Sequence, residues 1–221
     1  MLTLPDQPLL DKIALIGGCA RLDFGFDAER ALSEITALPD SSWGSRAGRV
    51  GVHDPAQAIF LRGHAPAQGD LPVEDRDELA QLPYLRELIK EVIPAPALRC
   101  VLAQLSAGGI IAPHIDQGEY FSKTIRLHFP ITTNENVWMN CAGLSYQMHS
   151  GEIWALNNSI GHGVINADAS RARLHMICDF LSSAELVEIL ARADRGLGRP
   201  NPAIKARLIE AQHQAQQAGK L

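Results

Sequence analysis

The chain has 221 residues, of which 46% are hydrophobic and 20% charged, and its formal net charge is −5. A chain of this length can bury a sizeable core without a disulfide or a structural metal. An acidic balance and an aromatic content of only 5% argue against a nucleic-acid partner, because phosphate neutralisation needs a basic excess and base stacking needs aromatic surfaces. Length and composition therefore favour one globular domain that binds no nucleic acid.

Two sequence features bear on the cellular compartment of the protein: the spacing of its cysteines and the length of its apolar runs. Cys19, Cys100, Cys141 and Cys178 are widely separated and form no CxxC pair, which is typical of reduced thiols in a cytosolic protein. The apolar run over 13–20 is too short for a signal or a membrane helix, and no basic region opens the chain. We therefore expect a cytoplasmic protein without membrane contact.

Residues 1–97 predict a mixed, partly helical region. The text AERALSEITAL suits a short helix that begins near Asp27, and residues 58–62 (AIFLR) have strand character. Apolar residues at helical spacing predict a second helix over 82–92, which the two following prolines end.

Residues 98–182 are dominated by short strand-like runs between turn signals. These runs are RCVLAQL, KTIRLHFPITT, VWMNCA, LSYQMH, EIWALN, HGVIN and RLHMICDF. Seven or eight strands at about ten-residue spacing indicate a β-sandwich or a small barrel. Residues 183–221 predict two helices, and the second, over 202–218, would pack on the barrel or form a homodimer contact. The expected fold is one mainly β domain with flanking helices.

A metal-ligand pattern lies inside this predicted β-core. His114 and Asp116 are two positions apart, so on an extended segment they project to the same face, and His162 opens the HGVIN run. Two histidines and one carboxylate on one face of an octahedron form the facial triad of non-haem Fe(II) oxygenases. A chain with eight histidines also produces such a pattern by chance, so a polar loop pair with a surface histidine stays open here.

Two predicted strands each carry an Arg-x-His pair. Arg126 and His128 share one strand face, and Arg173 and His175 share one face of the closing strand. Solvated edge strands would explain either pair alone, but two such strands around a possible metal pair favour a polar barrel interior. An arginine there can bind a carboxylate through two charge-assisted hydrogen bonds, as the distal end of 2-oxoglutarate requires.

The segment from Arg99 to Phe180 resembles the aspartyl/asparaginyl β-hydroxylase family of Fe(II)/2-oxoglutarate oxygenases, and in particular a bacterial branch similar to proline hydroxylases. The resemblance rests on LSAGGIIAPHID, RLHFPITTN, SGEIWALNNSIGHGVIN and RLHMICDF, in that order. It implies a double-stranded β-helix (jelly-roll) core and a hydroxylase that consumes O₂ and 2-oxoglutarate and releases succinate and CO₂. The implied substrate is a free amino acid, a small metabolite or an Asp/Asn-type residue.

The same resemblance implies roles for individual residues. The iron ligands would be His114, Asp116 and His162. Arg173 would hold the distal carboxylate of 2-oxoglutarate, although Arg171 has the same strand parity and stays an alternative. Arg126 and His128 would lie near the carboxylate of 2-oxoglutarate that is proximal to iron.

Two positions depart from the animal hydroxylases of epidermal-growth-factor domains. Those enzymes have Gly where this chain has Asp116, and a cosubstrate-binding Ser where it has Ala103. The complete triad makes the bacterial small-molecule branch the better comparison and disfavours a halogenase. At Ala103 this chain lacks the serine hydroxyl that contacts the cosubstrate in those animal enzymes.

The sequence specifies the substrate and its binding pocket less closely than the metal ligands. Candidate pocket residues are Trp43, Arg46, His53, Arg62 and Trp138, with Glu119 and Tyr120 near the mouth. The chain shows no additional peptide-binding domain, which favours a small molecule over a folded protein. Two alternatives stay open: a cupin-like metal-dependent isomerase or dioxygenase that needs no 2-oxoglutarate, and a non-catalytic jelly-roll binding module.

Overall fold

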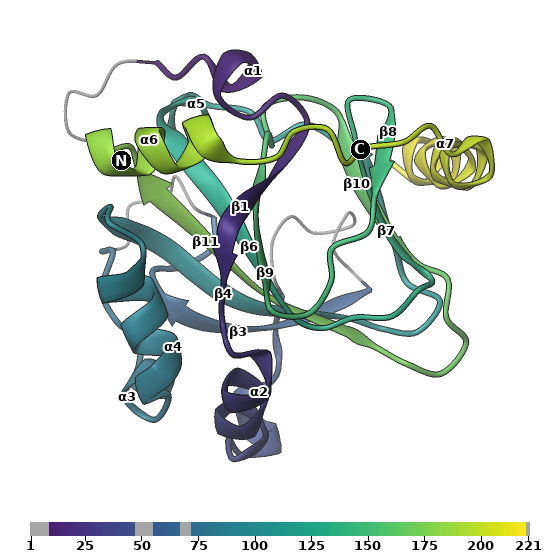
Figure 1. Cartoon of the computed structure of the whole chain (residues 1–221). Coiled ribbons are helices and arrows are strands. Elements are labelled where there is room, and N and C mark those ends of the chain that lie inside the picture. The colour runs from purple at the N-terminus through teal and green to yellow at the C-terminus, as the bar shows by residue number, and fades with distance from the viewer. Residues whose placement is uncertain (1–8, 47–54, 67–71, 220–221) are drawn as a thin grey trace.

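The computed structural model describes residues 9–46, 55–66 and 72–219, in which two antiparallel sheets pack face to face with helices outside them (Figure 1). The strands are β1 (Cys19–Gly25), β2 (Ser45–Arg46), β3 (Ala56–Arg62), β4 (Ala97–Leu105), β5 (Ile110–His114), β6 (Thr124–Thr132), β7 (Val137–Cys141), β8 (Leu144–Tyr146), β9 (Glu152–Leu156), β10 (His162–Asn166) and β11 (Arg173–Leu181). The helices are α1 (Lys12–Leu15), α2 (Ala28–Thr36), η1 (Asp40–Ser42), α3 (Asp77–Ala80), α4 (Pro83–Glu87), η2 (Leu88–Val92), α5 (Glu119–Lys123), α6 (Ala184–Arg192) and α7 (Pro202–Gln217).

The two sheets confirm the expected mainly β, jelly-roll architecture. The larger sheet has the strand order β1-β9-β6-β11-β4-β3-β2, and the smaller one has the order β5-β10-β7-β8. Each of the seven runs expected as strands contains one, and β5 adds a strand on the segment IIAPH. The first 62 residues also contribute β1, β2 and β3 to the larger sheet, so this sheet extends beyond residues 98–182.

The alternation along β6 and β11 decides what each face of the larger sheet contacts. Ile125, Leu127 and Phe129 belong to the main apolar core, and so do Leu174 and Met176 on the neighbouring strand. Helices α2, α3 and α4 cover this face and add their own buried side chains to the same core (Figure 1). The opposite, polar face of β6 and β11 therefore turns inward, toward the smaller sheet.

The expected helices begin where capping residues stand. The side chain of Asp27 accepts a hydrogen bond from the Arg30 amide at the start of α2, and Ser183 does the same for Leu186 in α6. The helix expected over 82–92 is present as α4 followed by the π-helical turn η2.

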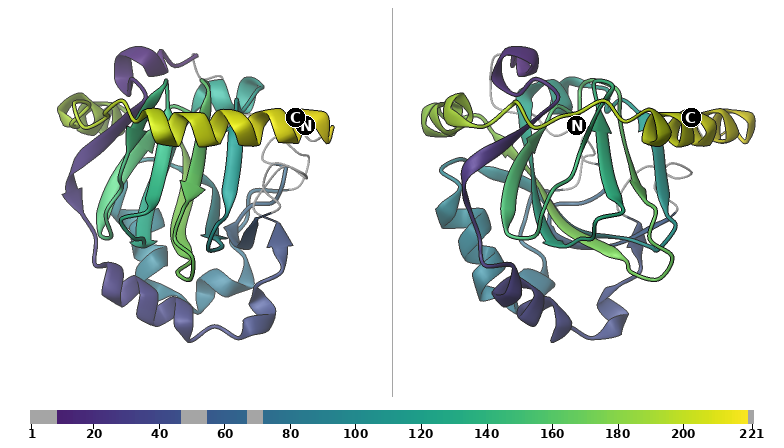
Figure 2. Two further views of the ribbon diagram at one scale, coloured as in Figure 1. Left: turned by 90° about the vertical axis from the view of Figure 1, so that its right-hand side faces the viewer. Right: turned by 45° about the vertical axis from the view of Figure 1, so that its right-hand side comes forward.

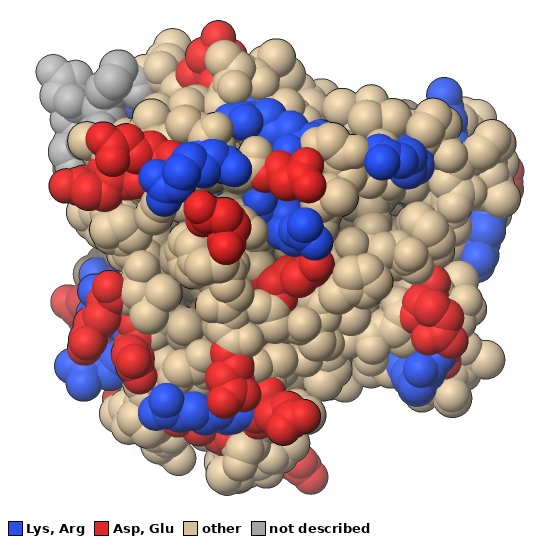
Figure 3. All heavy atoms as spheres, in the orientation of Figure 1, with Lys and Arg blue, Asp and Glu red and all other residues tan. Residues whose placement is uncertain are grey.

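Helix α7 lies across the outside of the smaller sheet (Figure 2). Asn201 caps its first turn, and Ile204 and Leu208 pack against Ile165 of β10. The helix is thereby packed on the barrel, as one of the two expectations had it, and a homodimer contact stays a prediction. Within the described residues, none of the helices combines the length and the hydropathy that spanning a membrane requires. Acidic and basic side chains are interspersed on the face shown in Figure 3.

Candidate metal and cosubstrate site

A cavity lies between the two sheets and is lined by residues from both. The cavity opens to solvent, and the space inside it that the centre of a water molecule can occupy is about 70 Å³. Its polar lining residues are Arg99, His114, Arg126, His128, His162 and Arg173. Its apolar lining residues include Ala56, Val101, Ala103, Ile111, Met139, Leu156, Val164 and Ile177. The cavity thus joins the two predicted histidine ligands to both predicted Arg-x-His strands.

The predicted metal ligands come together at the paired ends of β5 and β10. His114, the last residue of β5, pairs in register with His162, the first residue of β10. Asp116 follows two residues after His114, and its backbone amide donates to the Asn158 carbonyl at 3.0 Å. One ligand atom from each of the three side chains lies within 4.8 Å of the other two. This spacing suits three ligands of a single metal ion.

Backbone carbonyls orient both imidazole rings. Nδ1 of His114 is 2.9 Å from the Ala112 carbonyl oxygen. Nδ1 of His162 is 3.0 Å from the Ile160 carbonyl oxygen. A ring that donates Nδ1–H to a carbonyl directs its Nε2 lone pair toward a metal. Burial and the neighbouring His114 lower the pKa of His162 to about 3, so this ring is neutral at neutral pH, as metal ligation requires.

Asp116 has one oxygen engaged and the other directed toward the histidines. Oδ2 accepts hydrogen bonds from Nη1 of Arg126 at 2.5 Å and Nδ2 of Asn158 at 3.0 Å. Oδ1 lies 3.7 Å from Nε2 of His114. Burial raises the pKa of Asp116, but the charge of Arg126 and the hydrogen bond from Asn158 outweigh it and hold this pKa well below its ordinary value. Asp116 is therefore an ionised carboxylate with a fixed orientation, as a metal ligand needs to be.

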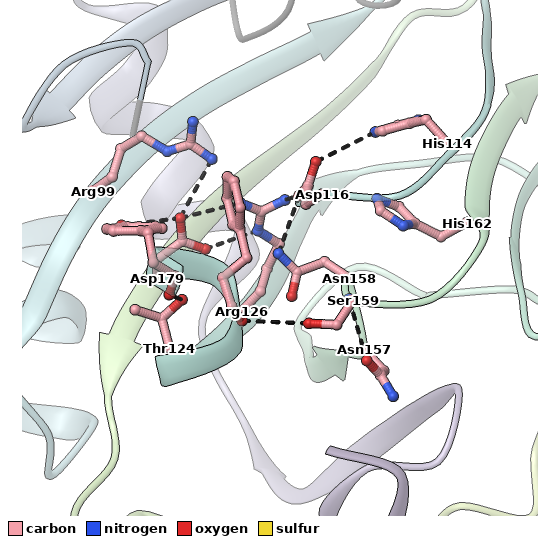
Figure 4. A network of polar contacts seen from close by, with 12 residues as sticks. Arg99, His114, Asp116, Thr124, Arg126, Asn157, Asn158, Ser159, His162 and Asp179 are labelled. Atoms are coloured by element: carbon pink, nitrogen blue, oxygen red, sulfur yellow. Dashed lines mark hydrogen bonds and ion pairs between the residues drawn. The ribbon is translucent and has the colours of Figure 1, made fainter. Parts of the chain in front are cut away.

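Arg126 connects Asp116, one of the three candidate metal ligands, to a second buried carboxylate, that of Asp179 (Figure 4). Nε and Nη2 of Arg126 donate to the two oxygens of Asp179 at 2.8 and 3.1 Å. The hydroxyl of Tyr120 donates to Asp179 at 3.2 Å, and Nη2 of Arg99 lies 3.3 Å from the same oxygen. Burial lowers the pKa of Arg126, but the charges of Asp179 and Asp116 raise it by more. The pKa therefore lies above its ordinary value, and Arg126 stays charged.

A second chain of contacts reaches Asp116 from the amino-terminal helix. Nζ of Lys12, in α1, donates to Oδ1 of Asn158 at 2.7 Å, while Nδ2 of Asn158 donates to Asp116. Lys12 is only 4% exposed. Burial and the nearby charge of Arg126 lower the pKa of Lys12 to about 8. Lys12 therefore fixes the side-chain orientation of Asn158, which in turn orients the carboxylate of Asp116.

The opposite, deep end of the cavity has a different character. Nη2 of Arg173 donates to Nδ1 of His175 at 2.7 Å, so the proton of that neutral ring lies on Nε2. His128 packs edge-on against His175, with ring centroids 5.7 Å apart. Among the described residues, nothing bonds to Nε of Arg173 or to Nε2 of either histidine, although all three atoms are buried. Burial lowers the pKa of Arg173 to about 9, which is the effect expected of a guanidinium without a carboxylate partner.

The structure separates the two arginines that strand parity could not. Arg173 is 2% exposed and lines the cavity. Arg171 lies before β11 at the surface, with a side chain that is 54% exposed and paired with Asp168 and Glu135. Of these two arginines, only Arg173 faces the cavity.

A profile of the aspartyl/asparaginyl β-hydroxylase family matches residues 59–183, more than half of the chain. The chain belongs to this family. Its members are 2-oxoglutarate/Fe(II) oxygenases, so the family implies a hydroxylase that uses Fe(II) and 2-oxoglutarate. Family membership and the His-x-Asp…His group confirm the enzyme class expected from the sequence.

Two solved hydroxylase structures are similar to this chain, and the first of them has the same fold. A prolyl hydroxylase from Trichoplax adhaerens, solved with a hypoxia-inducible-factor peptide, aligns with a TM-score of 0.51 and 10% identity, over 80% of this chain and 89% of that one. A prolyl-4-hydroxylase from Pseudomonas putida gives a TM-score of 0.42 and 16% identity, over 79% of this chain and 97% of that one. At 10% identity, the likeness to the Trichoplax enzyme concerns the fold alone.

The residues expected around the substrate mostly lie outside the cavity. Arg62 pairs with Asp75 and donates from Nε to the Ala97 carbonyl. Trp43 packs on the main core, and Trp138 packs under α7. His53 lies outside the described residues, and Arg46 is placed only by its backbone in β2. Of the two residues expected at the mouth, Glu119 is exposed and pairs with Lys123, and Tyr120 is buried against Asp179.

Several residues of the site were not singled out from the sequence. Asp179 shares strand parity with Arg173 and His175, so the same alternation could have identified it. Arg99 likewise shares parity with Ala103 on β4. Asn158 follows a strand in a turn, and Lys12 stands 146 positions before it, so no local pattern predicts their contact.

Proposed function

We propose that the enzyme hydroxylates a C–H bond of a small molecule, with Fe(II) held by His114, Asp116 and His162 and with 2-oxoglutarate bound between the iron and Arg173. The observation that carries this assignment is the arrangement within one cavity. Three ligand atoms gather at one end, and a buried guanidinium with an unpartnered Nε stands at the other end. The distal carboxylate of 2-oxoglutarate would supply the partner that Arg173 lacks.

The donor set fits Fe(II). Two imidazoles and one carboxylate on one side of the ion leave adjacent coordination sites for a chelating oxo-acid and for O₂. The ring of His162 is neutral, and Asp116 is held ionised by Arg126 and Asn158. When bound, iron with 2-oxoglutarate and O₂ supplies the oxidising chemistry, with succinate and CO₂ as co-products.

The protein itself orients, binds and excludes water. Arg126 uses three of its five N–H donors on Asp116 and Asp179, so it fixes the carboxylate ligand. Its two other N–H groups, together with His128, are proposed to meet the iron-proximal carboxylate of 2-oxoglutarate. Apolar side chains such as Val101 and Ile177 line the space between the two ends and keep water from the bound cosubstrate.

An anaerobic titration tests this proposal. Metal-free protein is titrated with Fe(II) and then with 2-oxoglutarate while the visible metal-to-ligand charge-transfer band of the chelate is followed. We expect the band in the wild type and its loss in His162→Ala. Iron binding without the band would overturn the cosubstrate assignment and favour a metal enzyme that needs no 2-oxoglutarate.

A further inference from the structure

Arg99 is a buried cation that the proposed iron and cosubstrate chemistry does not use. It stands on β4, lines the cavity and is 9% exposed. Its one ion pair among the described residues is with Asp179, at 3.3 Å. Its Nε is buried and bonds to nothing in that part of the chain. A buried donor left in this state is destabilising unless a ligand satisfies it.

Asp179 is already committed elsewhere. Its two oxygens accept two hydrogen bonds from Arg126 and one from Tyr120. The longer contact with Arg99 is therefore an addition to a carboxylate whose charge Arg126 already balances. Asp116 cannot serve Arg99 either, because one of its oxygens faces Arg126 and Asn158 and the other faces His114.

Arg99 lies far along the cavity from Arg173, the arginine proposed to bind 2-oxoglutarate. Asp179, the ion-pair partner of Arg99, is six residues from Arg173 on β11. Their Cα atoms are therefore about 20 Å apart, at a rise of ~3.3 Å per residue. Arg126 links Asp179 to the ligand Asp116, so Arg99 belongs to the metal end and Arg173 to the far end. A five-carbon diacid that runs from the metal to Arg173 extends away from Arg99.

The charges of the described cavity residues also favour the binding of a second anion besides 2-oxoglutarate. Arg99, Arg126 and Arg173 oppose the carboxylates of Asp116 and Asp179. Bound Fe(II) would add two positive charges and 2-oxoglutarate two negative ones. The excess that remains is positive, and it lies where Arg99 faces the cavity.

We propose that Arg99 binds a carboxylate of the substrate, so that the enzyme acts on small carboxylic acids such as free amino acids rather than on neutral molecules. This inference rests on the proposed function, because it places the rest of the substrate at the metal end. A carboxylate at Arg99 would accept the unused Nε–H in a charge-assisted hydrogen bond. The apolar wall formed by Val101 and Ile177 would contact the aliphatic part of the same molecule.

A direct binding experiment tests the anion site without knowledge of the substrate. Protein labelled with [¹⁵N]arginine and loaded with Zn(II) and N-oxalylglycine is titrated with sodium acetate, and the arginine Nε–H resonances are followed. The Arg99 signal is assigned by its absence in Arg99→Lys. We expect acetate to shift this signal to saturation, whereas acetamide and sodium chloride at equal ionic strength leave it in place. A signal that does not move with acetate, or that chloride moves equally, overturns the proposal.

A turnover experiment tests the same site in the iron enzyme. Free amino acids and their carboxamides are compared by the succinate that they cause to be released. We expect only the free acids to stimulate turnover, and Arg99→Gln to raise their KM by about 30-fold or more with an unchanged charge-transfer band. Arg62→Gln, a half-buried arginine on the neighbouring strand and outside the cavity, is the matched control. Equal stimulation by acids and amides, or a wild-type KM in Arg99→Gln, contradicts the assignment of Arg99. Absence of the charge-transfer band from the wild-type enzyme contradicts the proposed function instead.

Discussion

The two ends of the cavity differ in how completely the protein satisfies its own polar groups. At the metal-ligand end, Asp116 and Asp179 accept hydrogen bonds from Arg126, Asn158 and Tyr120, and only Nε of Arg99 is a buried side-chain nitrogen without a partner among the described residues. At the deep end, buried nitrogens of Arg173 and His175 have no partner among the described residues, and neither has Nε2 of His128, which lies between the two ends. The protein thus orients the carboxylates beside the candidate metal ligands itself, and leaves more buried donors unsatisfied at the far end. On the proposed function, orientation is prepared where the metal would bind, and unsatisfied donors are held where the cosubstrate would bind.

The largest expected effect comes from removing a ligand at the metal end. Asp116→Ala and His162→Ala should abolish the charge-transfer band and 2-oxoglutarate turnover while the fold persists, because both residues belong to the site and not to the apolar core. Succinate release and far-UV circular dichroism measure the two properties. His213→Ala, on the exposed side of α7, is the control. Retained turnover in either ligand variant would contradict the ligand assignment.

The next largest effect is expected at the deep end. Arg173→Ala should weaken 2-oxoglutarate binding by about 2–5 kcal/mol, because it removes the buried cation that pairs with the distal carboxylate. The titration of the charge-transfer band gives this affinity, and Fe(II) binding should change little. Arg171→Ala serves as the matched control at the surface. If Arg171→Ala showed the larger loss, the two roles would have to be exchanged.

A smaller effect distinguishes orientation from ligation at the metal end. Asn158→Ala removes one of the two donors that hold Oδ2 of Asp116. We expect Fe(II) affinity to fall about 10–100-fold, as for other residues that orient metal ligands. Asn140→Ala, which removes a hydrogen bond to Ser145 in the smaller sheet, is the control. Unchanged iron affinity would show that Arg126 alone suffices to orient the carboxylate.

The last prediction concerns the stability of the metal-free protein instead of its activity, and here Lys12 has a defined dependence on pH. Burial lowers the pKa of Lys12 from its ordinary value of 10.5 to about 8 in the folded protein, so the folded state carries a destabilising buried charge. The destabilisation is fully present below about pH 8, where it amounts to about 3 kcal/mol, and it is relieved as the pH rises toward 10.5.

Denaturation of the metal-free protein measures this dependence. Lys12→Met should be more stable than the wild type near neutral pH, and the difference in the free energy of unfolding should narrow as the pH rises. Lys123→Met controls for the loss of a lysine outside this network. A difference that stays constant with pH would show that the burial of the Lys12 charge is not its cause.

Sequence periodicity predicted the strands, and residue spacing indicated three candidate metal ligands, which the structure brings within 4.8 Å of one another. Side chains alternate along a strand by a local rule, so the inward faces of β6 and β11 could be predicted from their Arg-x-His pairs. The spacing of His114 and Asp116 likewise follows from two adjacent positions on one extended segment. The same rule could not separate Arg171 from Arg173, because the strand begins only at Arg173.

By itself, the sequence determined the mainly β architecture, the candidate metal ligands and the enzyme family, because each depends on local spacing or on motifs in a fixed order. Only the tertiary structure decided that Arg126 orients Asp116, that Lys12 supports Asn158, and that Arg99 and Arg173 stand at opposite ends of one cavity. These contacts join segments up to 146 positions apart. The physical reason is that partners across a closed sheet are set by strand register and by the packing of two sheets, which no local pattern of side chains specifies.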